Sequence, residues 1–171
     1  FVADFKNEST PQMLLSLMTR GAVDNTGAEL FSSMMQTRCL LERECARLAA
    51  ENASKEDLEK LSSILDEMRV ASEPERFSDA NFRFHRTMLA ASGNIVYAMI
   101  FQSFGEVVKY YVSSYFTSPV RMQLSVSQHE TLLAALSARD ADRARDAVTV
   151  IMEEGIVKLN ELFGKGRPCR G

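Results

Sequence analysis

The sequence predicts an all-α protein, folded as an antiparallel bundle of six or seven helices with short connections. Apolar residues recur at helical spacing along almost all of the 171 residues, and no stretch shows the sustained alternation typical of a strand. Glycine and proline are scarce, at 8 and 4 residues, which favours long helices over many tight turns. Capping residues fall between the apolar stretches. One domain with a sizeable core is therefore expected.

Caps and stops place the helices of the first half. The pair Thr10-Pro11 opens a short helix through QMLLSLMTRG, and a long helix is expected over 27–52. Ser54 and Asp57 resemble a capping box at the start of KEDLEKLSSILDEMRVA.

In the second half, a helix over 74–92 stops at Gly93, and Asn94 caps the next helix. That next segment, IVYAMIFQSFGEVVKYYVSSYF, is apolar on nearly every side. We expect it at the centre of the fold, or at the centre and in an oligomer contact. Helices are also expected over 118–138 and, after an aspartate cap at 140, up to 163. The glycine-rich, basic tail 164–171 is expected to be flexible.

Composition limits the class of protein. With 46% hydrophobic residues, 25% charged residues and a net charge of −3, the chain is not expected to bind nucleic acid by itself. It contains no apolar run of membrane-spanning length, no secretory leader and no C-x-x-C pair, so we expect a cytoplasmic protein with reduced cysteines and no membrane partner. The opening FVADF lacks a starting methionine, which suggests a fragment of a longer protein.

Several polar residues fall on the apolar faces of these helices. Arg38 lies inside the apolar arc of the long helix, with Glu42 one turn away. A charged group in such a position is expected to be paired or bound to something. Three interpretations remain open: an ion pair with Glu42, an arginine whose stem packs while its head reaches water, or an arginine that binds a ligand.

Both histidines of the chain also point inward. His85 and Asn81 lie among the bulky residues of helix 74–92, and His129 lies in the middle of the apolar arc of helix 118–138. A single inward histidine is usually a hydrogen-bonded core residue. Two of them, with an inward asparagine and Arg38, predict a polar pocket inside the bundle. Imidazole and amide groups can bind a divalent metal, and arginine suits a carboxylate.

Sequence motifs for catalysis are missing. The chain has no G-x-S-x-G, H-E-x-x-H, P-loop or G-x-G-x-x-G motif. No general base or nucleophile accompanies the histidines, so a metal-dependent enzyme is the least supported class and we do not expect an enzyme.

Three segments resemble the C-terminal effector-binding (FCD) domain of FadR-type regulators in the GntR family. They are RCLLERECARLAAENASKEDLEKL, NFRFHRTMLAASGN and HETLLAALSARDADRARDAV, in this order. The resemblance extends from residue 1 to about residue 163. It implies a FadR-like helical bundle, a homodimer, and an N-terminal winged helix-turn-helix upstream of this chain that binds operator DNA under the control of a small metabolite.

Many members of that family hold a divalent metal with an aspartate and three histidines. The resemblance places Asn81 at the aspartate, His85 and His129 at two histidines, and Ile151 at the third. It therefore implies a reduced site, with Zn or Ni at low occupancy on His85, His129 and Asn81. The resemblance includes the fatty-acid-responsive members, which lack the full metal set and bind acyl-CoA instead. In the metal-type members, the arginine that corresponds to Arg38 faces the pocket and suits a carboxylate.

The leading hypothesis is an effector-binding and dimerisation domain over 1–163. An organic acid or acyl-CoA would bind near Arg38, Asn81, His85 and His129 and thereby control DNA binding. The alternative is a metal-dependent sensor with a divalent ion at His85 and His129.

Overall fold

The protein is described by a computed structural model that covers residues 25–163, and these residues form seven helices and no strand. In chain order the helices are α3 (Asn25–Asn52), α4 (Lys55–Val70), α5 (Pro74–Ala91), α6 (Ile95–Ser103), α7 (Gly105–Tyr115), α8 (Pro119–Ser137) and α9 (Ala141–Phe163). The all-α prediction is confirmed. The short helix expected after Thr10-Pro11 and the tail 164–171 lie outside the described residues.

Local side-chain caps define the starts of α4, α6 and α9. Ser54 and Asp57 form the expected capping box at α4, and the Asn94 side chain accepts hydrogen bonds from two backbone N–H groups of α6 at 3.1 and 3.3 Å. Asp140 accepts one from a backbone N–H of α9 at 3.0 Å. Ser118 differs from expectation, because it makes no side-chain cap and α8 begins with a first-turn proline alone.

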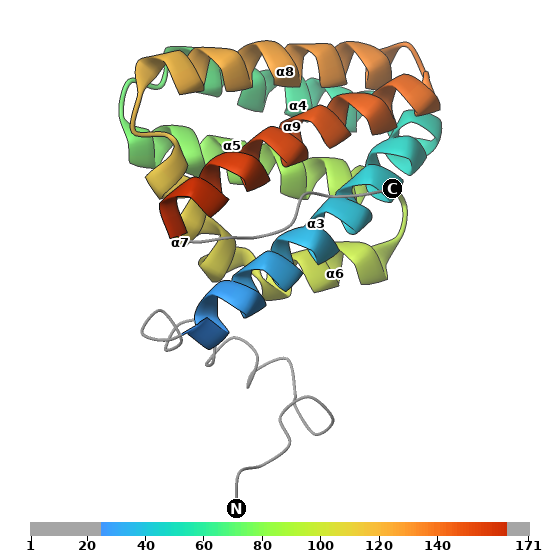
Figure 1. Cartoon of the computed structure of the whole chain (residues 1–171). Coiled ribbons are helices and arrows are strands. Elements are labelled where there is room, and N and C mark those ends of the chain that lie inside the picture. The colour runs from blue at the N-terminus through green and yellow to red at the C-terminus, as the bar shows by residue number, and fades with distance from the viewer. Residues whose placement is uncertain (1–24, 164–171) are drawn as a thin grey trace, which may run out of the picture.

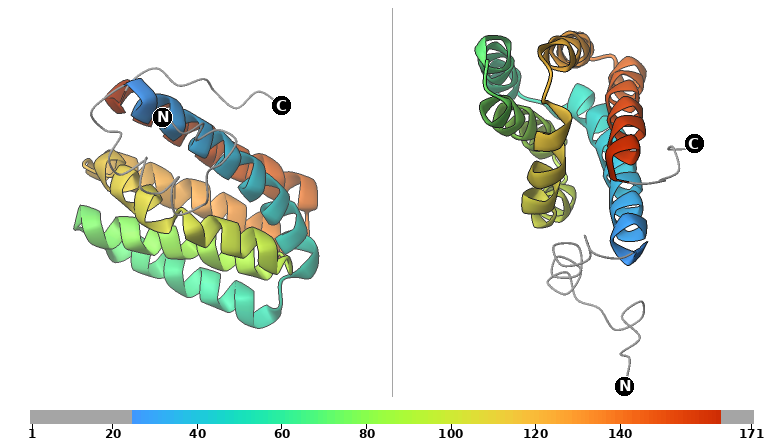
Figure 2. Two further views of the ribbon diagram at one scale, coloured as in Figure 1. Left: turned by 90° about the horizontal axis from the view of Figure 1, so that it is seen from below. Right: turned by 60° about the vertical axis from the view of Figure 1, so that its left-hand side comes forward.

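The helices are arranged as a closed ring. The long helix α3 packs against both α9 and α5, α5 packs against α4, α4 against α8, and α8 against α9 (Figure 1). The shorter helices α6 and α7 lie beside α5, and they also contact α3 and α9 respectively. In the right-hand view of Figure 2, α4 and α5 lie on one side, α3 and α9 lie on the other, and α8 lies near the top between them. Side chains that point inward from different helices therefore meet in one place.

A backbone turn and a hydrogen bond fix the C-terminal end of α5. Gly93 adopts a positive φ of 79°, which reverses the chain after α5 with no steric cost for glycine. At the same end, Nδ2 of Asn52 donates a hydrogen bond of 2.9 Å to the carbonyl of Ser92 and ties α3 to α5. Near the middle of α5, the rings of Phe82 and Phe101 stack at 5.2 Å and hold α6 against it.

The apolar segment over 95–116 differs from expectation in two ways. It divides at Phe104 into α6 and α7, and a Cβ added to Gly105 would lie 3.1 Å from Cζ of Phe82, so glycine allows this close approach. The segment is also not central along its whole length. Phe101 is buried, but four large apolar side chains of α6 are exposed, at 36–73%: Ile95, Val96, Met99 and Ile100. The helix α6 is therefore apolar on all sides although only one of its faces is buried.

Candidate functional site

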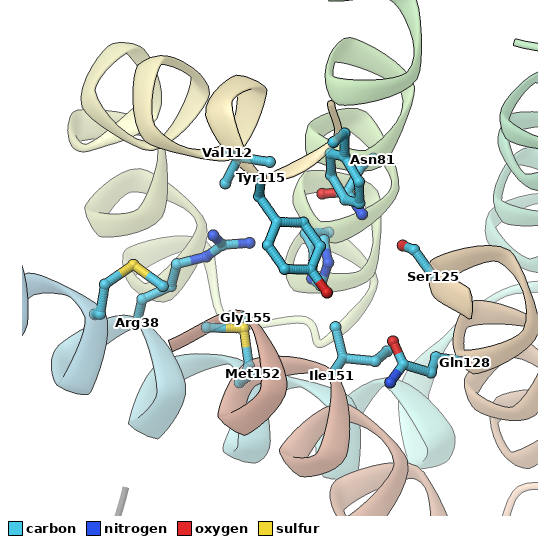
Figure 3. Close-up of a pocket in the computed structure, with 12 residues that line it drawn as sticks. Arg38, Asn81, Val112, Tyr115, Ser125, Gln128, Ile151, Met152 and Gly155 are labelled. Carbon is cyan, nitrogen blue, oxygen red and sulfur yellow. The ribbon is translucent and has the colours of Figure 1, made fainter. Parts of the chain in front are cut away.

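A small cavity lies inside the ring, between α3, α5, α7, α8 and α9. Residues from all five helices line it: Met35, Arg38, Asn81, His85, Val112, Tyr115, Phe116, Ser125, Gln128, Ile151, Met152 and Gly155 (Figure 3). The cavity has a volume of about 40 Å³. That is room for a few water molecules and not for a drug-sized ligand.

The first wall of the cavity carries a buried ion pair. Arg38 and Glu42 lie one turn apart on α3, exposed by 4% and 0%, and Nε of Arg38 donates to Oε1 of Glu42 at 2.5 Å. The second carboxylate oxygen, Oε2, lies against Nδ1 of His85 on α5, and neither of these two atoms has another hydrogen-bond partner. The Arg38 guanidinium also lies 5.5 Å from the centre of the Phe101 ring. Glu42 therefore joins two helices through two partners.

The charge of Glu42 is set by opposing effects. Its complete burial acts to raise the pKa, but the positive charge of Arg38 and the interaction with His85 outweigh burial and lower the pKa from 4.5 to about 2. Glu42 is therefore ionised at neutral pH. Because an ionised carboxylate only accepts hydrogen bonds, Nδ1 of His85 must carry a proton.

His129 continues this chain of polar contacts from α8. Its Nδ1 donates to the Ser125 carbonyl at 2.7 Å, and its Nε2 lies 3.2 Å from Nδ2 of Asn81 and 3.2 Å from Nε2 of His85. The ring of Phe84 packs edge-on against it at 4.8 Å. Burial, with the nearby His85, lowers the pKa of His129 from 6.5 to about 3. A neutral His129 thus presents an acceptor nitrogen toward Asn81 and His85.

The opposite wall of the cavity is formed by α7, α8 and α9. The Tyr115 ring lies across the cavity from Arg38, with its hydroxyl on the side of Ile151 and Gln128 (Figure 3). Burial, assisted by the negative charge of Glu154, raises the pKa of Tyr115 to about 12. Gln128 donates a hydrogen bond of 2.5 Å to that same carboxylate. A neutral tyrosine hydroxyl and an amide therefore complete the polar lining.

Three of the four residues proposed from the sequence, Arg38, Asn81 and His85, line this cavity, and His129 lies behind them in contact with Asn81 and His85. Arg38, Asn81, His85 and His129 are each no more than 4% exposed, as their helical spacing predicts; their role in binding a ligand stays a prediction. The Arg38–Glu42 ion pair, one of the alternatives left open for Arg38, is present. The contact between Glu42 and His85 was not predicted, because it depends on how α3 and α5 pack. Nothing in the sequence pattern indicated that Tyr115 and Gln128 would line the cavity.

The geometry of the two histidines bears on the metal expectation. Both Nδ1 atoms face acceptors, so the two Nε2 atoms converge, which is the orientation that metal-bound histidines usually have. The other two positions of the family's metal site do not supply good metal ligands. Asn81 is uncharged, Ile151 has no donor atom, and the described part of the chain holds no cluster of three or more His, Cys, Asp or Glu side chains suited to a metal. Protein zinc sites use three or four such ligands. The residues therefore do not fit a tightly held divalent ion, and the metal-sensor alternative is not favoured.

Several known proteins are similar to this chain in sequence and in fold. Residues 33–154 match the FCD domain family. The galactonate operon transcriptional repressor of Escherichia coli (strain K12) is 27% identical over 136 residues, which are 78% of this chain and 59% of the repressor. The putative L-lactate dehydrogenase operon regulatory protein of the same organism is 32% identical over 120 residues, or 67% of this chain and 46% of that protein. The chain thus spans about half the length of the curated relatives it matches.

Among solved structures, E. coli McbR/YncC superposes with a TM-score of 0.69 at 22% identity, covering 89% of this chain and 83% of that one. None of the helices described over 25–163 is long and apolar enough to cross a membrane. The family match spans most of the chain and the superposition supports the same helical fold. The chain belongs to the FCD domain family of GntR-type transcriptional regulators.

Proposed function

We propose that this chain is the sensor and dimerisation region of a transcriptional regulator, and that its effector is a small hydroxy acid. The observation that supports this proposal is a connected row of buried polar groups, from Arg38 through Glu42, His85 and His129 to Asn81, of which Arg38, His85 and Asn81 line the cavity. Burying so many polar groups lowers stability, so a purely structural role does not explain them well. A binding site for a polar ligand accounts for their presence.

The chemistry of the lining fits a hydroxy acid. The Arg38 guanidinium can donate to a carboxylate, and the Asn81 amide and the Ser125 hydroxyl, which also line the cavity, can hydrogen-bond to a hydroxyl. The small free space favours a compact acid over an acyl-CoA, whose chain would require helices to move apart. The names of two relatives point the same way, because they refer to operons for galactonate and for L-lactate dehydrogenase.

Binding would have to rearrange the existing contacts. Because Glu42 already occupies Nε of Arg38, an incoming carboxylate uses the other guanidinium nitrogens or displaces Glu42. Displacing Glu42 would break its contact with His85, which links α3 to α5, and so allow these two helices to shift relative to one another. In a complete dimeric regulator, such a shift would change the spacing of two N-terminal DNA-binding domains and thus operator affinity.

Calorimetric titration and thermal shift test this proposal. The panel holds lactate, galactonate, other small hydroxy acids, the neutral amide of lactate, and an acyl-CoA. We expect saturable binding of at least one hydroxy acid and none of the amide. Arg38→Lys keeps the charge next to Glu42 but loses the planar guanidinium, so affinity should fall about tenfold or more. Arg47→Lys, at an outward-facing ion pair of the same helix, is the matched control.

Two outcomes count against the proposal. No binding across the panel, together with operator binding by the complete regulator that ignores every compound, would exclude a sensor of this type. Binding of acyl-CoA alone would keep the sensor function but replace the hydroxy acid.

A further inference from the structure

The exposed face of α6 is unusual for a helix in contact with water. Its nine residues, IVYAMIFQS, include no charged side chain. The α6 ridge, defined as Ile95, Val96, Met99 and Ile100, is 36–73% exposed, on the side of the helix opposite the buried Phe101. Contiguous apolar surface without charge is typical of the centre of a protein–protein contact.

A groove of about 710 Å³ runs beside this ridge, between α6 and the pair α4 and α5. Small side chains line its middle, among them Thr87, Ala90 and Ala98. Its rim carries charges of both signs, from Asp57, Lys60 and Arg86 in the same lining. Ile95 and Met99 of the ridge form one wall of this groove, and small side chains of α5 and α6 line the space beside them.

Such a surface is complementary to itself. In a twofold contact, each element on one copy meets its counterpart on the other, so a patch must contain both halves of every interaction. Here the ridge offers the projecting side chains and the groove the space for them. The rim charges, one negative and two positive, can pair across the same axis.

We propose that this face is where two copies of the chain associate, with the α6 ridge of each copy seated in the groove of the other. The inference rests on the proposed dimerisation function and names its surface. Stable dimers bury about 800 Å² on each partner. The ridge alone is too small for that, so the groove walls from α4 and α5 must be covered as well.

Sedimentation of the full chain over a range of concentrations tests this surface. Met99 is 65% exposed, so Met99→Glu should leave the circular dichroism and melting of the monomer unchanged. In the dimer it places two charges in an apolar contact, and we expect dimerisation to weaken about 100-fold or more. Ile95→Lys, at 73% exposure, should behave alike. Val120→Glu on α8, at 72% exposure, is the control that leaves the dimer intact.

A crosslinking experiment identifies what covers the ridge. A photo-reactive amino acid replaces Met99 in an equal mixture of chains with natural and heavy nitrogen. We expect mixed-isotope crosslinks from position 99 to α4, α5 or α6 of the other copy. Crosslinks to residues 1–24, a monomeric parent chain, or a dimer unaffected by Met99→Glu would each overturn the proposal. Since the cavity lies inside the ring, ligand titration of these variants separates this failure from that of the sensor function.

Discussion

Replacing Glu42 by glutamine tests whether the buried charge network stabilises this domain. The substitution keeps the size of the side chain and one acceptor oxygen, but it leaves the buried Arg38 without a counter-charge. The pKa of Glu42 lies at about 2 instead of 4.5, and each pKa unit corresponds to about 1.4 kcal/mol, so the ionised form contributes about 3 kcal/mol at neutral pH. This agrees with the roughly 3–5 kcal/mol lost when a buried ion pair is broken.

Urea unfolding followed by far-UV circular dichroism measures this loss directly. Glu44→Gln is the matched control, because Glu44 lies on the same helix and pairs with Arg47, but its side chain is 43% exposed. We expect that control to cost less than about 1 kcal/mol. Because the pKa of Glu42 is lowered, its contribution is present above pH 4.5 and disappears as the pH falls toward 2. Equal losses for Glu42→Gln and Glu44→Gln at neutral pH would refute the reasoning.

Three further predictions concern the same cavity. The pKa of His129 is lowered from 6.5 to about 3, so as the pH falls the imidazole is protonated in the unfolded chain before it is protonated in the folded one. The free energy of unfolding should therefore fall by about 2 kcal/mol between neutral pH and pH 5. In unfolding measured at several pH values, His129→Gln should reduce this dependence on pH, and an unchanged dependence would contradict the assignment. The double variant Asn81→Asp with Ile151→His should bind Zn²⁺ or Ni²⁺ at about one equivalent by elemental analysis, whereas Asn81→Asp with Val150→His, at a 55% exposed neighbour, should not. Gly155→Ala should raise the free energy of unfolding by about 0.5–1 kcal/mol, because alanine favours the helix and no atom beyond the adjacent part of α9 lies within 4 Å of the added Cβ. A loss of stability would show that the cavity does not tolerate the added methyl group.

The positions of the site residues could be predicted because helical periodicity is a local property. Arg38, Asn81, His85 and His129 each follow from counting along a single helix whose apolar face is well marked. Sequence spacing also indicated Glu42 as a neighbour of Arg38, one turn away on α3. Such counting assigns a residue to a face, and all four of these faces point into the ring.

Contacts between helices could not be predicted in the same way. The pairing of Glu42 with His85 depends on where α3 crosses α5, and the convergence of the two histidines depends on where α5 meets α8. Which side of α6 stays exposed could not be predicted for a related reason. An apolar helix is expected inside a protein, and only the arrangement of its neighbours shows that one side stays uncovered.

The packing of α3 against α9 has a consequence for synthesis of the chain on the ribosome. Arg38 and Glu42 sit on the first described helix, yet this helix is covered by the last one, which begins at Ala141. At about 5–20 residues per second, α9 emerges on the order of 10 s after α3. Until then α3 lacks one of its two main neighbours and its charges remain hydrated. We therefore expect the buried ion pair to form as a late event, after synthesis of α9, and a chain stalled before α9 should expose α3 to proteolysis.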